Sequence, residues 1–391
     1  MELIRLQDSD PKKAHELYNT FPKEETGYTN PVFGYSYEEF LTYVERKRKW
    51  TKGEDLPEGF VADTTYVLED NGEYVGSFNF RHYLNDFLRE GPGHIGYGIK
   101  KEYRGRGYAS KGLRLLIDIV RTQGIDTQEI YLEVNKDNPA SLRVQLKNGA
   151  YIHHESEKCY YTRIPIWDYD IKLTEADLNA DIDEIEKSAI SVAEMRDADA
   201  YTIRTKTTGR ELMYRAATGV FRAFDGWTGK SIAIIVGGGN NGGDGYALAG
   251  ILKDKGIDSK VYKVSDKMSD DGSFYCDIAK NRGLPVCDFT ADMDLKGYEI
   301  IVDCILGTGF KGEVRGLARD AIEAINDANA FVISVDINSG LNGDTSEATL
   351  AVRSDMTVSI GYFKKGMFSS GAKELTRRLI NADIGIELVP V

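Results

Sequence analysis

The alternation of short apolar runs with amphipathic segments over residues 191–391 constrains the fold more than any other feature of the sequence. The runs are rich in β-branched residues and have the length of strands, while the segments between them have helical periodicity. Strands connected through helices pair in parallel, and a parallel sheet is covered by helices on both faces. We therefore predict an α/β domain of three layers with a mostly parallel sheet. Its predicted strands are 231–236, 259–264, 300–304, 331–335 and 356–360, and its predicted helices are 246–255, 273–281 and 318–327.

Residues 1–167 alternate differently and predict a separate α+β domain with a mixed sheet. The predicted strands here are 65–68, 74–80, 94–99 and 130–134, and the predicted helices are 37–50 and 110–123. All five histidines lie in this part of the chain, at His15, His82, His94, His153 and His154. Acid–base chemistry in residues 191–391 must therefore use other groups.

The segment between these regions is strongly acidic. Residues 171–190 carry six acidic residues against two lysines, which is typical of a solvated charged helix. Ser191 and Glu194 then match a capping box, in which a hydroxyl and a carboxylate three residues apart begin a helix. We therefore predict an acidic helical linker over 168–190 and a second domain that begins at residue 191.

The overall composition excludes several classes of protein. A net charge of −13 over 391 residues argues against a nucleic-acid-binding surface, which needs a basic face. No apolar run approaches the roughly 18 residues of a membrane span, and the N-terminus lacks the apolar core of a signal peptide. The four cysteines are scattered and form no zinc-type cluster. We expect a cytoplasmic protein that binds neither membranes nor nucleic acid.

A glycine-rich turn follows the predicted strand 94–99 and precedes the predicted helix 110–123. It consists of Arg104, Gly105, Arg106, Gly107, Tyr108 and Ala109. Glycines between a strand and a helix expose several backbone N–H groups together, and the helix dipole adds partial positive charge. The turn is therefore a candidate cradle for a pyrophosphate, although the same pattern also occurs in plain tight turns.

Residues further along the chain strengthen the first interpretation. Asn138, Ser141, Lys147 and Gly149 follow the turn at a spacing that, together with Arg104, Gly107 and Ala109, resembles the GNAT acyltransferase superfamily. The resemblance spans about residues 1–165. It implies that acetyl-CoA or another acyl-CoA binds with its pyrophosphate on the amides of 105–109 and its pantetheine arm near Asn138. The acyl acceptor is not readable from the sequence, although an amine is usual in the superfamily.

One position departs from the superfamily pattern. Gln145 stands where many members have a tyrosine that protonates the leaving thiolate. Tyr160 or Tyr161 could replace that acid, and Glu133 could act as a base through water. For each of these three residues a purely structural role is the favoured alternative.

A second glycine-rich segment follows the predicted strand 231–236. Gly237, Gly239 and Gly242 satisfy the dinucleotide pattern GxGxxG. A dehydrogenase is nevertheless disfavoured, because Asp244 would place negative charge beside the pyrophosphate. The next predicted strand also ends without the acidic residue that would bind a ribose, since its last residues are Tyr262, Lys263 and Val264.

Hard oxygen ligands gather at the predicted carboxyl ends of three strands. Asn240, Asn241 and Asp244 follow the first, Asp303 ends the second, and Asp336 follows the third. Open α/β sheets bind ligands at this edge, and amide and carboxylate oxygens suit an alkali or alkaline-earth cation. The sequence therefore predicts a site at this edge, although any single acid there could instead cap a helix.

Three motifs in this region resemble the NAD(P)HX epimerase family, the YjeF N-terminal domain, which is Rossmann-like. They are Asn-Asn-Gly-Gly-Asp-Gly at 240–245, Val-Asp-x-x-x-Gly-Thr-Gly at 302–309 and Val-Asp-x-x-Ser-Gly at 335–340. The family interconverts the R and S epimers of hydrated NADH or NADPH. The resemblance spans about residues 188–388.

The resemblance also implies roles for individual residues. A potassium ion would be bound by Asn241, Asp303 and Ser339. Asp336 would be the catalytic acid or base. The hydrate would contact Asn240, Asn241, Gly242, Gly243, Asp244, Gly307, Thr308, Gly309, Phe310, Lys311 and Gly312. Homodimers are the family's habit, and a separate NAD(P)HX dehydratase is expected in the same pathway.

The motifs leave a second functional class open. Gly238 and Asn338 stand where proline is common in the family, and Tyr214 stands where glutamate is usual. Our first hypothesis is a bifunctional enzyme, with an acyltransferase-like domain fused to an epimerase. The alternative is a sensor or scaffold that binds a nucleotide and acyl-CoA without epimerase turnover.

Overall fold

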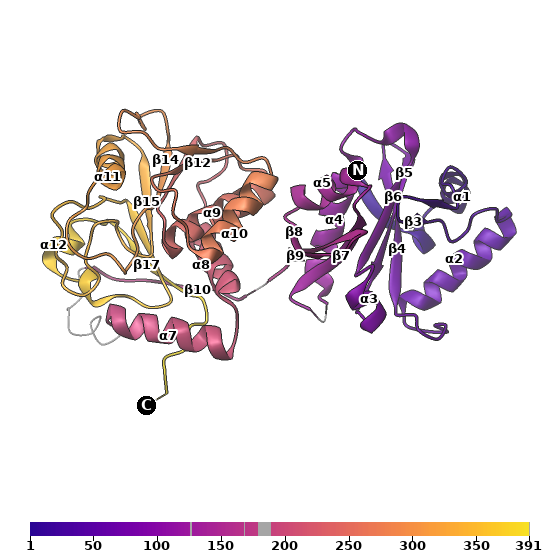
Figure 1. The fold of residues 1–391 in the computed structure, drawn as a ribbon, viewed down its shortest axis with the longest axis horizontal. Helices are drawn as coiled ribbons and strands as arrows, with labels where there is room; N and C mark the ends of the chain where they lie inside the picture. Colours follow the sequence, from indigo (N-terminus) through magenta and orange to yellow (C-terminus); the bar gives the residue numbers. More distant parts are fainter. Residues whose placement is uncertain (126, 168, 179–188, 391) are drawn as a thin grey trace. The chain divides into compact units, whose positions relative to one another are not determined.

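The structure is a computed structural model that describes residues 1–391 except 126, 168, 179–188 and 391. The chain forms two compact units, residues 1–167 and residues 168–391 (Figure 1). Each unit has its own sheets and its own hydrophobic core. In the part of the chain that the structure describes, no helix is long and apolar enough to cross a membrane.

The first unit contains a four-stranded sheet in the order β1-β4-β5-β6 and a three-stranded sheet in the order β7-β9-β8. Its strands are β1 (Glu2–Arg5), β2 (Glu24–Glu25), β3 (Tyr28–Thr29), β4 (Asp63–Asp70), β5 (Glu73–Arg81), β6 (Ile95–Ile99), β7 (Glu129–Asn135), β8 (Tyr151–Glu155) and β9 (Cys159–Pro165). Its α-helices are α1 (Pro11–Asn19), α2 (Tyr37–Thr51), α3 (Asp86–Glu90), α4 (Tyr108–Gln123) and α5 (Pro139–Lys147). The predicted α+β domain is confirmed.

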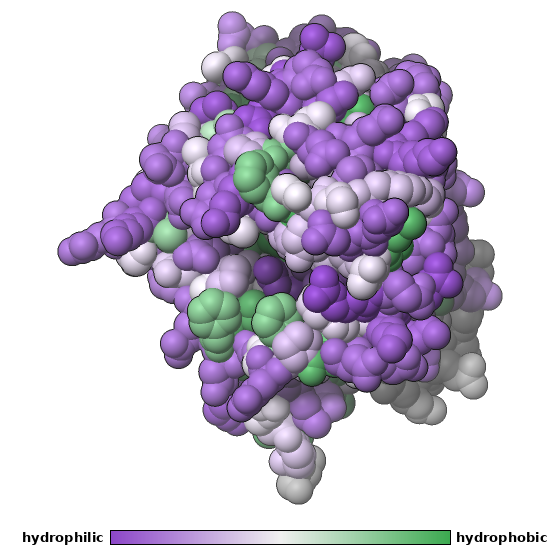
Figure 2. Space-filling model, turned by 90° about the vertical axis from the view of Figure 1, so that its right-hand side faces the viewer, coloured by the Kyte–Doolittle hydropathy of each residue, from purple (hydrophilic) through white to green (hydrophobic). Residues whose placement is uncertain are grey.

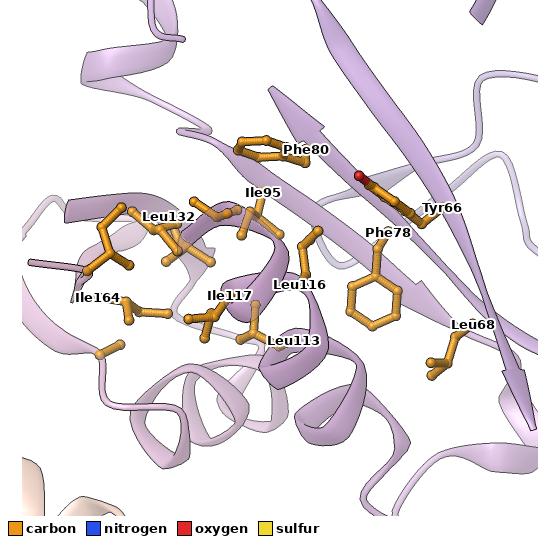
Figure 3. Packing of buried hydrophobic residues seen from close by; sticks show 14 of the residues in the cluster. Tyr66, Leu68, Phe78, Phe80, Ile95, Leu113, Leu116, Ile117, Leu132 and Ile164 are labelled. Carbon is orange, nitrogen blue, oxygen red and sulfur yellow. The ribbon is translucent and has the colours of Figure 1, made fainter. Parts of the chain in front are cut away.

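Helix α4 supplies one wall of this unit's core. Leu113, Leu116 and Ile117 recur at helical spacing and are completely buried. They pack against Phe78 on β5 and Ile95 on β6 (Figure 3). A methyl group on Gly112 would come within 2.3 Å of the Phe78 ring, so a glycine is required where the helix crosses the sheet. This packing fixes α4 and the turn that precedes it.

The second unit contains an eight-stranded sheet in the order β10-β17-β16-β15-β14-β11-β12-β13. The strands are β10 (Lys172–Glu175), β11 (Ile232–Val236), β12 (Lys260–Lys263), β13 (Val286–Asp288), β14 (Ile300–Cys304), β15 (Phe331–Val335), β16 (Met356–Ile360) and β17 (Leu379–Asp383). The α-helices are α7 (Val192–Thr205), α8 (Gly209–Ala223), α9 (Asn240–Asp254), α10 (Asp270–Asn281), α11 (Leu317–Asp327) and α12 (Ser370–Lys373). Seven strands are parallel and β10 is antiparallel, which confirms a mostly parallel sheet.

Two predictions about local structure are wrong. Residues Lys172–Glu175, placed in a helical linker, form the edge strand β10, because their backbone pairs with the otherwise free edge of β17 and Glu175 bonds to Arg378. Residues 179–188 of the predicted linker lie outside the described residues. The asparagine–glycine segment predicted as a loop before a helix at 246 is itself the first turn of α9, which begins at Asn240.

Close packing explains the glycines in that first turn of α9. A methyl group on Gly242 would lie 2.1 Å from the carbonyl oxygen of Gly237, and one on Gly245 would lie 2.7 Å from Val236. The helix therefore approaches strand β11 more closely than any side chain would allow. Its N-terminus lies at the carboxyl end of the parallel strands, where the other predicted site residues also lie.

Candidate active sites

The turn at residues 104–109 in the first unit has the conformation that the glycines predict. Gly105 and Gly107 have φ values of 73° and 84°, a region that glycine enters without steric cost. Helix α4 begins at Tyr108 directly after Gly107, so its first N–H groups are free of intrahelical partners. The turn borders a cavity of about 1210 Å³. This geometry suits a pyrophosphate.

Two polar residues that were predicted to bind acyl-CoA also form hydrogen bonds within the protein. Arg104 bonds through both terminal nitrogens to Glu25, at 3.1 and 2.6 Å, and through Nε to the carbonyl of Ile99. Asn138 caps α5, where its Oδ1 accepts from the Ser141 N–H at 3.1 Å. Arg104, Gly105, Gly107, Tyr108, Ala109 and Asn138 line the cavity, whereas Arg106 is exposed and does not belong to its described lining.

The two tyrosines considered as substitute acids and Glu133, considered as a base, have different surroundings. Glu133 lines the cavity, but Tyr160 and Tyr161 are not part of its described lining. Tyr161 instead stacks on His154 with ring centroids 4.4 Å apart. Tyr97 was not predicted from the sequence, and its hydroxyl lies 2.8 Å from Ser141 Oγ. Burial raises the pKa of Tyr97 to about 12, which keeps this cavity-lining phenol protonated.

In the second unit, Asp303 and Ser339 form one buried hydrogen-bonded network. Ser339 donates through Oγ to Asp303 Oδ1 at 2.5 Å and through its backbone N–H to Oδ2 at 3.0 Å. Ser334 Oγ and the N–H of Ile305 also donate to this carboxylate. Burial nevertheless raises the pKa of Asp303, because these donors only partly replace water. The network ties the ends of β14 and β15 together.

Asn241 lies at the N-terminus of α9 with both amide atoms buried and no hydrogen-bond partner among the described residues. Leaving a buried amide unpaired is costly, so its Oδ1 is a free ligand for a cation. A methyl group on Gly307 would lie 3.2 Å from the Asn241 Cβ, and Leu306 next to it donates its N–H to Ser339. The Asn241 amide, the Asp303 carboxylate and the Ser339 hydroxyl are thus a donor set that fits potassium.

Asp336, the predicted acid or base, has an unusual backbone. Its φ is 67°, a left-handed value that is strained for a residue with a side chain and that is common at functional sites. Its Oδ1 accepts from Lys364 Nζ at 2.5 Å, and its Oδ2 accepts from the Thr308 N–H at 3.3 Å. The Lys364 side chain is completely buried, and its ammonium also donates to Ser359 and the Ile360 carbonyl. The pair is therefore held rigidly.

The charge of Asp336 affects the pKa values of two more carboxyl groups. Burial and the charge of Asp336 raise the pKa of Asp199, on α7, to about 6. The same causes, with Asp199 added, raise the pKa of Asp244 well above its ordinary value. Asp199 and Lys364 were missed because no motif contains them. A lysine in the apolar run that follows β16 could have indicated Lys364 as a site residue. No feature of the neighbouring sequence indicates Asp199.

One objection to a dehydrogenase concerned the negative charge of Asp244. Burial, together with the charges of Asp336 and Asp199, raises the pKa of Asp244 and so disfavours its charged form, which weakens this objection. The second objection stands, because β12 ends at Lys263, which forms ion pairs with Asp266 and Asp288. A lysine there offers no acceptor for ribose hydroxyls.

Comparisons with known proteins find a matching family for each half of the chain. The family of the YjeF-related protein N-terminus matches residues 209–366, and the acetyltransferase (GNAT) domain matches residues 2–151. The NAD(P)H-hydrate epimerase of Levilactobacillus brevis is 36% identical over 207 residues, which cover 51% of this chain and 94% of that relative. The bifunctional NAD(P)H-hydrate repair enzyme Nnr of Coxiella burnetii is 31% identical over 49% of this chain and 40% of its own length.

Among solved structures, the GNAT domain of PAT from S. lividans covers 42% of this chain and 89% of that domain, with 13% identity and a TM-score of 0.31. The epimerase relatives and the match to the YjeF-related family both concern the half of the chain that contains Asn241, Asp303, Asp336 and Ser339. The chain therefore belongs to the NAD(P)H-hydrate epimerase family through its YjeF-related domain, and it carries a GNAT acetyltransferase domain before it.

Proposed function

We propose that the second unit interconverts the R and S epimers of hydrated NADH and NADPH, and that the first unit transfers an acyl group from acetyl-CoA or another acyl-CoA. The observation that carries the epimerase proposal is the rigid pair of Asp336 and Lys364 at the carboxyl edge of the sheet. Family membership adds the substrate class, since curated relatives bear the name NAD(P)H-hydrate epimerase.

The reaction inverts the ring carbon that bears the added hydroxyl, and it requires a proton to be moved at the oxygen of that hydroxyl. Epimerisation of a carbinolamine needs either loss and return of the hydroxyl or opening of the ring, and each route needs a proton donor and acceptor. Asp336 takes and returns this proton in our proposal. Lys364 orients its carboxylate and offsets its charge.

Backbone amides supply the anion site. The first turn of α9 begins at Asn240 without a side-chain cap, so its N–H groups are open to phosphate oxygens. We propose that residues 240–244 bind the hydrate's phosphates and ribose together with residues 307–312.

Potassium would be held by Asn241, Asp303 and Ser339. When bound, it supplies a fixed positive charge that stabilises the 305–307 segment and the substrate phosphates. Asn241→Ala should remove the ion's effect on stability, because the variant deletes a buried amide oxygen that has no hydrogen-bond partner among the described residues. Turnover that is equal in potassium and in tetramethylammonium salts would contradict this assignment.

The epimerase proposal is tested with hydrated NADH enriched in the R epimer, by following the S epimer chromatographically. We expect the wild-type protein to exceed the spontaneous rate, and Asp336→Asn to lose turnover while still binding the nucleotide. The control is Asp327→Asn, which makes the same change in a surface ion pair with Lys296. No acceleration by the wild type refutes the epimerase and leaves the sensor or scaffold.

The acyltransferase proposal rests on the positive-φ turn and the cavity that it borders. We expect acetyl-CoA to raise the melting temperature of the full chain. Free CoA thiol should then appear when an acceptor amine is added. Binding without any thiol release would favour the sensor. We further propose a cytoplasmic location, a homodimer, and a separate dehydratase that consumes the S epimer.

A further inference from the structure

The cavity of the first unit extends well beyond the turn at 104–109. Antiparallel pairing places Asp63 opposite Arg81 and Thr65 opposite Asn79 on neighbouring strands β4 and β5. Side chains two residues apart share a face of a sheet, and these four side chains line the cavity with Ser77. They form a polar strip across its floor.

The strip leads away from the CoA turn. Ser77 lies opposite Gly98, next to the end of β6 from which the turn departs, whereas Arg81 bonds to residue 94 before β6 begins. The four residue-to-residue steps from Ser77 to Arg81 span about 13 Å of strand. Arg81 and its neighbours therefore occupy the end of the cavity remote from the pyrophosphate cradle, where an acceptor would enter.

This remote end carries excess positive charge. Lys47 is 3% exposed and donates to both oxygens of Asp63, so the one carboxylate among the described lining residues of this end is already neutralised. Arg81 donates to the carbonyl of Gly93, and Arg46 lies 5.6 Å over the rings of Tyr43 and Trp50. Among the described residues, no carboxylate lies within ion-pair distance of Arg46 or Arg81. This positive charge is confined to one end of the cavity, since the chain as a whole has a net charge of −13.

The other carboxylates of the cavity lie toward its CoA end. Glu25 is paired with Arg104, and Glu133 lines the cavity from β7. An amine that reacts near Glu133 would place the rest of its frame toward Arg46 and Arg81.

Aromatic side chains line the same remote end. The rings of Trp50 and Phe60 lie 5.5 Å apart, and Phe60 and Phe87 are 58% and 73% exposed. Figure 2 shows apolar side chains beside a hollow on an otherwise hydrophilic face. Exposed aromatic rings at a cavity wall are typical of ligand sites. The arginines and the rings together match a ligand that has both an anionic group and an apolar frame.

We infer that this end of the cavity binds the acyl acceptor and selects a small primary amine that also bears a carboxylate or phosphate on an apolar frame. The inference rests on the proposed acyltransferase activity. Arg46 and Arg81 bind the anionic group, because guanidinium matches both carboxylate and phosphate geometry. The amine nitrogen forms a C–N bond to the thioester carbon as the C–S bond breaks, and the proton that nitrogen loses leaves with CoA as its thiol. Polyamines are repelled by the two arginines.

The test uses the full chain with acetyl-CoA and measures thiol release for matched pairs of amines. Phenylalanine and phenylalaninamide differ by the carboxylate, and tyramine phosphate and tyramine differ by the phosphate, so that the two pairs separate the two anion sources on an apolar frame. Spermidine is the cationic comparison. We expect kcat/KM to be about tenfold or more higher for the anionic member of at least one pair, as charge-assisted hydrogen bonds predict.

Variants locate the selectivity. Arg46→Gln, an exposed change, and Arg81→Gln should each raise the KM for the anionic amine without changing the KM for acetyl-CoA. Arg48→Gln is the matched control, because Arg48 lies on the same helix and pairs with Glu45 outside the cavity lining. If Arg81→Gln does not fold, Arg46→Gln alone decides.

Three outcomes overturn the inference: equal rates within both pairs, preference for spermidine, and no turnover of any anionic amine by protein that binds acetyl-CoA. Calorimetry with acetyl-CoA alone distinguishes these three outcomes from a failure of the proposed acyltransferase activity itself. Absence of acetyl-CoA binding refutes the acyltransferase proposal and the inference with it, whereas acetyl-CoA binding with the wrong selectivity refutes only the inference.

Discussion

Asp199→Asn should stabilise the second unit, and its effect should depend on pH in a definite direction. Asp199 lies on α7 and is partly buried near Asp336 and Lys364. Burial comes first among the causes that raise its pKa to about 6, and the charge of Asp336 adds to it. Folding therefore works against ionisation of this group, and an asparagine removes that conflict.

The sign follows from proton binding. Between the ordinary pKa of 3.8 and the folded value of about 6, the folded protein binds the Asp199 proton more tightly than the unfolded chain does. The stabilisation by this group is complete below about pH 4 and is lost as the pH rises through about 6. The two pKa values correspond to a loss of about 3 kcal/mol at pH 8. Asp199→Asn should thus gain up to about 3 kcal/mol at pH 8 and almost nothing at pH 4.

Native-state hydrogen exchange of the β14 and β15 amides measures this gain, since these central strands report the opening of the second unit. The control is Asp197→Asn, which makes the same charge change on an exposed position of the same helix. A gain that is independent of pH, or one that Asp197→Asn reproduces, would show that Asp199 is not buried against the Asp336 charge and would refute the reasoning.

Three further predictions concern the turns and the ion. Gly242→Ala should destabilise the second unit by about 1–3 kcal/mol in chemical denaturation, because its methyl group would meet the Gly237 carbonyl. Gly239→Ala, with open space around it, should destabilise the unit much less. Equal losses of stability would contradict the packing argument. Gly107→Ala should weaken acetyl-CoA binding in calorimetry, while Gly124→Ala, which has a similar positive φ at the other end of α4, should cost stability alone. Potassium chloride should raise the melting temperature above that in tetramethylammonium chloride, and a shift that survives Asn241→Ala would place the ion elsewhere.

Much of the fold and part of the sites could be predicted because they depend on local patterns. The β-branched runs and their helical spacers predicted the five central strands of the second unit, and Asp303 and Asp336 were placed at one edge because parallel strands end together. The edge strand β10 could not be predicted in this way. Its four residues are all exposed, so their sequence carries no burial pattern, and only pairing with distant β17 makes them a strand.

The sequence by itself determined that the chain has two domains, which motifs they carry, and which residues end the central strands, since each depends on residues close together in the chain. Only the tertiary structure decided what those residues touch. It brought Lys364 and Asp199 to Asp336, engaged Arg104 with Glu25, and raised the pKa of Asp244 by burial. The physical reason is that hydrogen bonding, ion pairing and desolvation act between neighbours in space, and the neighbours that perturb a charge here come from segments far apart in sequence.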